Sequence, residues 1–243
     1  MSIAVSLDFI SRARKTAPGA PSELAELAAV PALAGLGGDV QAALIVGAAL
    51  RRFPRRALLA PEGGVPSHVF VILHGRVRAV RRSPAGREVT LETFQTGDLL
   101  ADGVVFPERQ LLNDWEATEP TDVLALARQA FAGQIQAVPA LALNLAAQLL
   151  LRLERSKQLA AGLALADVPG RVVGALRGLA ESEGQAGPDG IVVHNRPTQQ
   201  EMANSIGACR ETVSRVVSDL ARRGLVTPRG RTLIISPLLM TST

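Results

Sequence analysis

The stretch from Thr198 to Gly224 has the pattern of two short helices joined by a tight turn. Gly207 falls at the turn, where glycine accepts a positive φ at little cost, and the small Ala203 lets the two helices approach closely. Thr198 and Glu201 have the spacing of a capping box, which predicts the start of the first helix. Apolar residues at helical spacing are predicted to pack the two helices together: Met202, Ile206, Val213 and Val216. The segment therefore predicts a helix-turn-helix.

The first turns of the second helix carry three charged side chains, Arg210, Glu211 and Arg215. An arginine fork matches O6 and N7 of guanine and a carboxylate accepts from N4 of cytosine, and each such pair discriminates against the wrong base by about 1–3 kcal/mol. The N-terminal end of a recognition helix is the end that enters the major groove. The alternative is a solvated face with an internal Glu211–Arg215 pair, which stabilises a helix by only about 0.3 kcal/mol. Within this motif the charges favour the recognition of DNA base edges.

Positive charge is concentrated in the same part of the chain. The net charge of the 243 residues is +4. Residues 192–232 account for all of it, with three acids and seven arginines, namely Arg196, Arg210, Arg215, Arg222, Arg223, Arg229 and Arg231. A basic C-terminal module on a neutral remainder is typical of a protein that binds nucleic acid. The one cysteine, Cys209, excludes a disulfide within the chain, and we expect it to act as a small, weak cap of the second helix.

Composition limits the remaining classes of protein. Hydrophobic residues make up 47% of the chain, which is enough for one large or two modest domains. No apolar run reaches about 18 residues, so no membrane span is predicted. The N-terminal basic cluster follows the apolar stretch, the reverse of a signal peptide, so a cytoplasmic protein is expected. His68, His74 and His194 lack the spacing of a metal site, and no nucleophile, base or paired carboxylates predict an enzyme.

Residues 50–126 have the sequence pattern of short strands separated by turns. A hairpin turn is predicted at His74-Gly75 and a second turn at 83–86. The strands expected around these turns are 69–73, 77–81, 88–94, 115–118 and 123–126. Several short strands at this spacing predict a small barrel or roll. Upstream, residues 22–50 are predicted to form short helices, and the first 21 residues are expected to be a frayed arm.

A long helix is predicted over Ala140–Ala166, which at helical rise extends about 40 Å. One stripe along it repeats at alternating steps of four and three, as in a helix that packs on a second copy of itself: Ala142, Ala146, Leu149, Leu153, Ser156, Ala160 and Leu163. Other leucines are expected to pack on the helix's own domain: Leu141, Leu143, Leu145, Leu150 and Leu151. The alternative is a helix buried only within its own domain. Two apolar sides favour a dimerisation helix that lies on a β-roll.

The chain on either side of the helix-turn-helix completes a winged module. The segments before it are expected to be a hinge, a helix, a loop and a strand, at 167–170, 171–180, 184–190 and 191–194. After it, residues 225–227 and 232–235 predict a hairpin. Arg229 and Arg231 lie at the turn of this hairpin, where their guanidinium groups can contact phosphate.

The runs GACRETVSRVVSDLARRGLV and PRGRTLIIS resemble the DNA-binding domain of the cyclic-AMP receptor/fumarate–nitrate regulator (CRP/FNR) superfamily. Upstream, VPALAGLGGDVQAALIVGAALRRFPRRALLAPEGG and VFVILHGRVRAV resemble its cyclic-nucleotide-binding-type β-roll, and LNLAAQLLLRLERSKQLA with LADVPGRV is similar to its dimer helix and hinge. The resemblance covers nearly everything after about Val30. It implies an α+β fold with an N-terminal β-roll, a long dimerisation helix and a C-terminal winged helix-turn-helix, at residues 22–138, 139–167 and 168–240.

The resemblance also implies the partners of the chain. It implies a bacterial, cytoplasmic homodimer that binds double-stranded DNA and regulates transcription. Arg210, Glu211 and Arg215 retain the family's residue types, which implies a GTGA-like half-site present twice as an inverted repeat about one helical turn apart. RNA polymerase is a further partner of such regulators, although no pattern here identifies a surface for it. The family's phosphate-contact positions are matched by Thr198, Gln200 and Thr212.

The effector region departs from the family. In nucleotide-binding relatives, a Gly-Glu-Leu turn and a Pro-Arg-Ser/Thr-Ala segment cradle the cyclic phosphate. This chain has Gly97-Asp98-Leu99 as the match to the first, with an acid one methylene shorter. Leu111 and Leu112 fill the arginine and serine positions of the second, and neither side chain can bind a phosphate.

A shift of two residues brings Arg109 and Gln110 to the arginine and serine positions, but only with a gap. Ser156, on the predicted dimer helix, takes the place where relatives touch the base. The residues therefore argue against cyclic AMP as the effector. Another nucleotide, such as cyclic di-GMP, and the absence of any effector both stay open.

Overall fold

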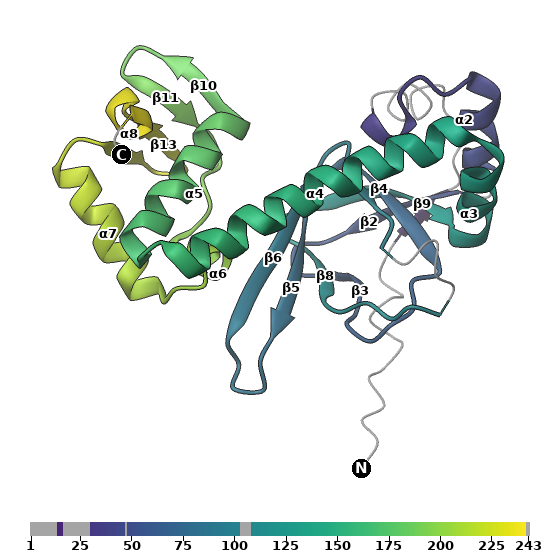
Figure 1. Ribbon diagram of the computed structural model, residues 1–243, viewed down its shortest axis with the longest axis horizontal. Helices are drawn as coiled ribbons and strands as arrows, with labels where there is room; N and C mark the ends of the chain where they lie inside the picture. Colours follow the sequence, from purple (N-terminus) through teal and green to yellow (C-terminus); the bar gives the residue numbers. More distant parts are fainter. Residues whose placement is uncertain (1–13, 17–29, 47, 103–107, 242–243) are drawn as a thin grey trace. The chain divides into compact units, whose positions relative to one another are not determined.

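A computed structural model of the chain describes residues 14–16, 30–46, 48–102 and 108–241. The chain divides into two compact units, and Figure 1 labels their helices and strands. The first unit contains residues 1–86 and 91–154, and the second contains residues 87–90 and 155–243. Much of the predicted N-terminal arm and of the first predicted helices falls on residues 1–13 and 17–29, which lie outside the described residues.

The roll is made of β1 (Arg14–Thr16), β2 (Ala49–Phe53), β3 (Leu58–Ala60), β4 (His68–His74), β5 (Arg76–Arg82), β6 (Glu88–Gln95), β7 (Leu99–Leu100), β8 (Asp114–Ala117) and β9 (Thr121–Ala127). One sheet has the order β1-β2-β9-β4-β7 and the other the order β3-β8-β5-β6. These strands confirm the predicted roll of an α+β protein. β1 differs from the expected frayed arm, because its three residues pair antiparallel with β2.

The hairpin predicted at His74-Gly75 is wrong, because β4 and β5 belong to different sheets. Gly75 is the corner at which the chain passes from one sheet to the other. Its φ is +93°, and a Cβ there would lie 2.6 Å from the carbonyl oxygen of Pro120 and from Oγ1 of Thr121. The buried Thr121 hydroxyl also accepts from the amide of Arg76 at 3.2 Å. Turn residues identify a change of direction, but they do not say whether the flanking strands pair across it.

The described helices of the first unit are η2 (Pro31–Leu33), α2 (Gly38–Ile45), α3 (Arg128–Ala137) and α4 (Pro139–Leu165), the last of which continues into the second unit. The sequence predicted short helices where η2 and α2 lie, although β2 already begins at Ala49, inside that range. No single helix among the described residues is long and apolar enough to cross a membrane. Only α3 and α4 taken together, bent by 109° at their junction, meet such a criterion of length and composition.

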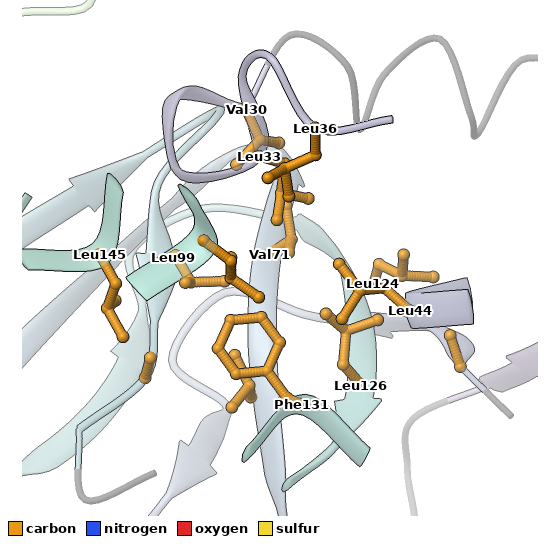
Figure 2. Packing of buried hydrophobic residues seen from close by; sticks show 14 of the residues in the cluster. Val30, Leu33, Leu36, Leu44, Val71, Leu99, Leu124, Leu126, Phe131 and Leu145 are labelled. Atoms are coloured by element: carbon orange, nitrogen blue, oxygen red, sulfur yellow. The ribbon is translucent and has the colours of Figure 1, made fainter. Parts of the chain in front are cut away.

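Strand β4 is buried on both faces, because its side chains alternate between two apolar clusters. On one face Val71 packs with Phe131 of α3 and Leu145 of α4 (Figure 2). On the other face Ile72 packs with Trp115 of β8 in the space between the two sheets. Side chains of successive strand residues point to opposite faces, so one short strand contributes to both clusters. The helices α3 and α4 are thereby attached to the roll.

Helix α4 starts and ends one residue before its predicted limits, and it has two distinct sides. Leu141 and Leu145 are buried against the roll, as predicted. The predicted packing of three further leucines on their own domain is wrong, because Leu143, Leu150 and Leu151 are 70%, 56% and 55% exposed. At 100° per residue these three point away from the buried stripe. The predicted seam is also mostly exposed: Ala142, Ala146, Leu149, Leu153, Ser156, Ala160 and Leu163.

The second unit contains α5 (Val168–Glu183), β10 (Gly184–Gly187), β11 (Gly190–Val193), α6 (Gln199–Ile206), α7 (Arg210–Arg222), β12 (Val226–Arg229), β13 (Thr232–Ile235) and α8 (Pro237–Thr241). Its sheet has the order β10-β11-β13-β12. The loop predicted at 184–190 is wrong, because β10 pairs antiparallel with β11. The glycines of this segment gave no signal for a strand. A glycine is nevertheless required at position 184, because a Cβ there would collide with the carbonyl oxygen of Ala180.

Candidate nucleic-acid interface

The helix-turn-helix has the local geometry that its sequence predicts. The Thr198 Oγ1 accepts from the amide of Glu201 at 3.1 Å, and Oε2 of Glu201 accepts from the amide of Thr198 at 2.8 Å, which completes the capping box. Gly207 ends α6 in the left-handed conformation with a φ of +63°. The two ends of α6 are thus fixed by residues within the motif itself.

Helices α6 and α7 pack through an apolar seam. The predicted members Met202, Ile206 and Val213 are buried, and Val216 is half-buried. Ala203 is fully buried, as expected where two helix backbones approach. Two further members at the same helical spacing, Val217 and Leu220, were not predicted from the sequence. Because these residues of α7 are buried, the opposite face of α7 is exposed.

The base-reading residues proposed from the sequence lie on that outward face. Arg210, Glu211 and Arg215 are exposed in the first turns of α7. Within the part of the chain that the structure describes, no ion pair joins Glu211 to Arg215, so the internal pair considered above is not formed. Arg215 instead donates to Oγ1 of Thr212 at 3.5 Å. The charged groups at this helix end are therefore open to an external partner.

Cys209 occupies the N-cap position of α7, but its side chain makes no capping hydrogen bond, so the expected cap is wrong in that respect. Its Sγ lies 3.0 Å from Oγ1 of Thr212. Hydrogen bonding from Thr212 lowers the pKa of the Cys209 thiol below its ordinary value. The hydroxyl of Thr212, a predicted phosphate contact, thus contacts the side chains of both Cys209 and Arg215.

The wing is the hairpin of β12 and β13, which pair from Val226↔Ile235 to Arg229↔Thr232. Arg229 and Arg231 are exposed at its turn, where the sequence placed them. Arg229 lies 3.9 Å from Asp189, with both side chains about two-thirds exposed. An ion pair so exposed contributes little to stability, so Arg229 stays available to a phosphate group.

The residues proposed for an effector pocket are largely engaged within their own segments. The Asp98 carboxylate accepts from the amide of Gln95 at 2.8 Å, and the φ of Gly97 is +91°, so the two residues form the turn between β6 and β7. Leu99 is buried in the apolar cluster around Phe131. The remaining candidates are exposed, either ahead of β8 or on α4: Arg109, Gln110 and Ser156.

A charged cluster that was not predicted from the sequence joins α4 to β6. Arg152 of α4 donates from Nε and Nη2 to the two oxygens of Glu92, at 2.8 Å each, and lies 3.0 Å from Asp102. Its guanidinium carbon is 4.9 Å from the centre of the Phe94 ring. Burial acts to lower the pKa of Arg152, but the bonds to Glu92 and Asp102 outweigh it and raise that pKa. In the sequence, the one indication of this cluster was that Arg152 interrupts a run of apolar residues in a predicted helix.

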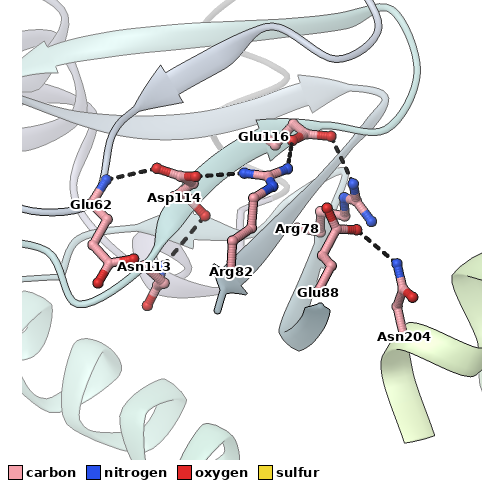
Figure 3. Close-up of polar contacts among 8 residues, drawn as sticks. All are labelled: Glu62, Arg78, Arg82, Glu88, Asn113, Asp114, Glu116 and Asn204. Atoms are coloured by element: carbon pink, nitrogen blue, oxygen red, sulfur yellow. Dashed lines mark hydrogen bonds and ion pairs between the residues drawn. The ribbon is translucent and has the colours of Figure 1, made fainter. Parts of the chain in front are cut away.

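A second buried network joins β5 and β8 (Figure 3). The Glu116 carboxylate binds Arg78 at 2.8 Å and also Arg82, which reaches Asp114 at 2.5 Å. Burial acts to raise the pKa of Glu116, but the hydrogen bonds from Arg78 and Arg82 outweigh it and lower that pKa below 4.5. Glu116 is only 8% exposed, so its charge depends on both arginines.

We expect Glu116→Gln to lower the free energy of unfolding by about 2 kcal/mol. Loss of one partner from a fully buried ion pair costs about 3–5 kcal/mol, and Arg82 is partly solvated here. Because the folded-state pKa is lowered, the carboxylate stabilises the fold above its ordinary pKa, and this contribution disappears as the pH falls through the folded value. Urea unfolding at pH 7 and at pH 3 measures both effects. If Glu116→Gln lowered the free energy of unfolding equally at the two pH values, the charge of Glu116 would not be what stabilises the fold.

The described residues contain no group of three or more histidine, cysteine, aspartate or glutamate side chains arranged to hold a metal ion. His68 instead places Nε2 3.1 Å from Nη2 of Arg51, with its Nδ1 2.8 Å from the hydroxyl of Ser67. The charged clusters of the first unit are therefore arginine–carboxylate networks.

Comparisons with known proteins agree with this geometry. The cyclic nucleotide-binding domain family matches residues 50–137, and the Crp-like helix-turn-helix domain family matches residues 170–238. A CRP-like cAMP-activated global transcriptional regulator of Mycobacterium tuberculosis is 33% identical over 186 residues, which are 76% of this chain and 82% of the relative. The cAMP-activated global transcriptional regulator CRP of Pasteurella multocida is 28% identical over 188 residues, which are 76% of this chain and 89% of the relative.

Solved structures share the fold. The c-di-GMP responsive global regulator CLP of Xanthomonas campestris has a TM-score of 0.72 at 22% identity, covering 82% of this chain and 99% of that one. A CooA mutant from Carboxydothermus hydrogenoformans also has a TM-score of 0.72, at 23% identity, covering 93% of this chain and 95% of that one. With both domain families matched in order and relatives covered over most of their length, the chain belongs to the CRP/FNR superfamily of transcription regulators.

Proposed function

We propose that the chain acts as a dimer that binds a GTGA-like inverted repeat in double-stranded DNA. The observation that carries this proposal is the exposed group of Arg210, Glu211 and Arg215 at the start of α7, with no ion pair between Glu211 and Arg215 among the described residues. An arginine that is not held by a carboxylate can offer its fork to a guanine. The proposed chemistry is recognition and regulation, without catalysis.

A second copy of the chain is the proposed partner of the exposed seam on α4. Leu149, Leu153 and Leu163 are 48%, 50% and 44% exposed along it. A continuous apolar stripe on a long helix is unfavourable in water and is typical of a surface that another molecule covers. The alternating spacing of four and three fits a second helix of the same sequence. Two copies related by a twofold axis would present two recognition helices, as an inverted repeat requires.

Contacts to the DNA backbone are proposed for five further residues of the second unit: Thr198, Gln200, Thr212, Arg229 and Arg231. Backbone contacts position the protein on the duplex and carry little sequence information. Arg229 and Arg231 supply charge, whereas the other three supply polar groups. We expect binding to random DNA to depend on the two arginines.

A binding selection tests this proposal. Purified protein is incubated with a library of random duplexes at moderate salt, and the bound fraction is sequenced, with sedimentation equilibrium run on the same sample. The expected result is an enriched inverted repeat with GTGA-like halves and a mass of two chains. A monomer, or a library that stays random, would refute the proposal. Transcription assays with RNA polymerase then distinguish activation from repression.

For the β-roll we propose an effector other than cyclic AMP, such as cyclic di-GMP or another nucleotide. Leu111, which takes the phosphate-binding arginine position in our alignment, is 5% exposed within an apolar cluster. The guanidinium of Arg152, which lies 4.9 Å from the ring of Phe94 in the same apolar cluster, is already bound by Glu92 and Asp102. A cyclic phosphate entering here would therefore meet an apolar side chain and two carboxylates. CLP, described as responsive to c-di-GMP, shares the fold.

Calorimetry tests the effector proposal. We expect cyclic AMP to give no binding at micromolar concentrations, because Leu111 fills the arginine position and the guanidinium of Arg152 is already bound by two carboxylates. Cyclic di-GMP is titrated in parallel, and operator affinity is measured with and without each nucleotide. Micromolar binding of cyclic AMP would overturn the proposal, whereas a change in operator affinity with cyclic di-GMP alone would support it.

A further inference from the structure

The link between β11 and α6 is joined to the wing by one residue, Arg196. Its backbone amide donates to the carbonyl oxygen of Arg231 at 2.9 Å. Its side-chain Nε donates to the carbonyl oxygen of Gly230 at 3.1 Å. The residue before it, Asn195, has a φ of +52°, a left-handed conformation that asparagine tolerates better than most residues. This backbone shape directs both donors of Arg196 at the turn of the wing.

These two hydrogen bonds leave the terminal Nη groups of Arg196 available to a further partner. Only Nε is used by Gly230, and no carboxylate among the described residues pairs with the two Nη groups. The side chain is half-buried, and its Nε is held by the carbonyl oxygen of Gly230. A guanidinium fork whose orientation is fixed in advance loses less side-chain entropy when it binds a phosphate.

The position of Arg196 connects two groups of proposed phosphate contacts. Gly230, which it binds, lies between Arg229 and Arg231 in the chain, and Arg196 is two residues before Thr198 at the start of α6. Arg196 is one of the seven arginines of residues 192–232, and it is not among the DNA contacts proposed above. We propose that Arg196 contacts a DNA phosphate and at the same time holds the wing for the contacts of Arg229 and Arg231. This inference rests on the proposed DNA-binding function.

Two substitutions separate the charge of Arg196 from its hydrogen bond. Arg196→Gln keeps an amide that can donate to Gly230 but removes the charge, whereas Arg196→Lys keeps the charge but loses the fork. Each phosphate contact adds about 0.9 to the slope of log K against log salt, so loss of one contact from each of two subunits lowers the slope by about 1.8. At about 0.15 M salt this corresponds to a loss in affinity of about 30-fold.

Arg81→Gln is the matched control, because Arg81 is an exposed arginine of the roll, 56% exposed and 3.7 Å from Glu62. Operator affinity is measured between low and moderate salt for all variants. We expect Arg196→Gln to lower the slope, Arg196→Lys to keep it, Arg81→Gln to leave it unchanged, and the preference among operator sequences to survive in all three. If Arg196 only held the wing, Arg196→Gln, which can still donate to Gly230, would leave the slope unchanged.

If Arg196→Gln has the slope of Arg81→Gln, the inference is wrong while the proposed function stands. If the unsubstituted protein itself prefers no duplex, the proposed function fails instead. A thermal melt of each variant accompanies the titrations. Should Arg196→Gln lower the melting temperature, the slope of the folded Arg196→Lys protein decides the matter, since a slope reduced with the charge still present would also overturn the inference.

Discussion

We expect Arg210→Ala to reduce affinity for the selected operator by about 5- to 150-fold per half-site, because one bidentate contact to guanine contributes about 1–3 kcal/mol of discrimination. Arg210 is exposed at the first position of α7, so its removal leaves the apolar seam behind it intact. The variant also loses preference at one base pair of each half-site, while its affinity for random DNA falls far less. Competition titrations against operators altered at single positions measure this preference.

Two controls accompany the Arg210 experiment. Arg229→Ala, at the turn of the wing, is expected to weaken binding to all sequences alike, since a phosphate contact carries no base preference. Arg81→Ala removes the same charge from the roll and should leave the operator preference untouched. An Arg210→Ala protein that still discriminates at every position would show that another side chain recognises the guanine.

We expect Leu153→Glu to abolish the proposed dimer and to lower operator affinity by about 1000-fold, to the level of non-specific binding. Leu153 lies in the centre of the exposed seam of α4 and is 50% exposed in the single chain. A carboxylate there would have to be buried between two helices without a partner, which is costly. Sedimentation equilibrium gives the mass, and a titration of operator DNA gives the affinity.

Leu151→Glu is the matched control for this substitution. Leu151 is 55% exposed, close to the value for Leu153, but it lies two residues earlier and so on a different side of the helix. The control should stay dimeric and bind the operator normally. A dimer that survives Leu153→Glu, or dissociates equally with Leu151→Glu, would mean that the heptad stripe is not the contact surface.

The sequence was most informative where the determinants of structure are close together in the chain. The capping box of Thr198 and Glu201 and the left-handed Gly207 all lie within one short motif, and the structure confirms each of them. The heptad spacing of α4 is also a local pattern, and its members are mostly exposed, while their role as a dimer contact stays a prediction. Local signals of this kind need no knowledge of the tertiary fold.

Prediction failed where the determinants are distant. Arg152 and Glu92 are 60 residues apart, and neither residue type nor spacing indicates that they meet. The strands on either side of Gly75 were expected to pair, although β5 lies in the other sheet between β6 and β8, and β8 follows much later in the chain. The exposed leucines of α4 were assigned to the wrong side for a related reason: an apolar residue does not indicate what covers it.

Trp115 has a practical consequence for spectroscopy. It is the single tryptophan of a chain with no tyrosine, and it is fully buried between the sheets of the roll, where its indole N–H has no hydrogen-bond partner among the described residues. Near-ultraviolet fluorescence excited at the indole band therefore arises in the first unit alone. A denaturation curve recorded by emission follows the roll, while far-ultraviolet ellipticity follows both units, so a difference in midpoint between the two signals measures how independently the roll and the winged module melt.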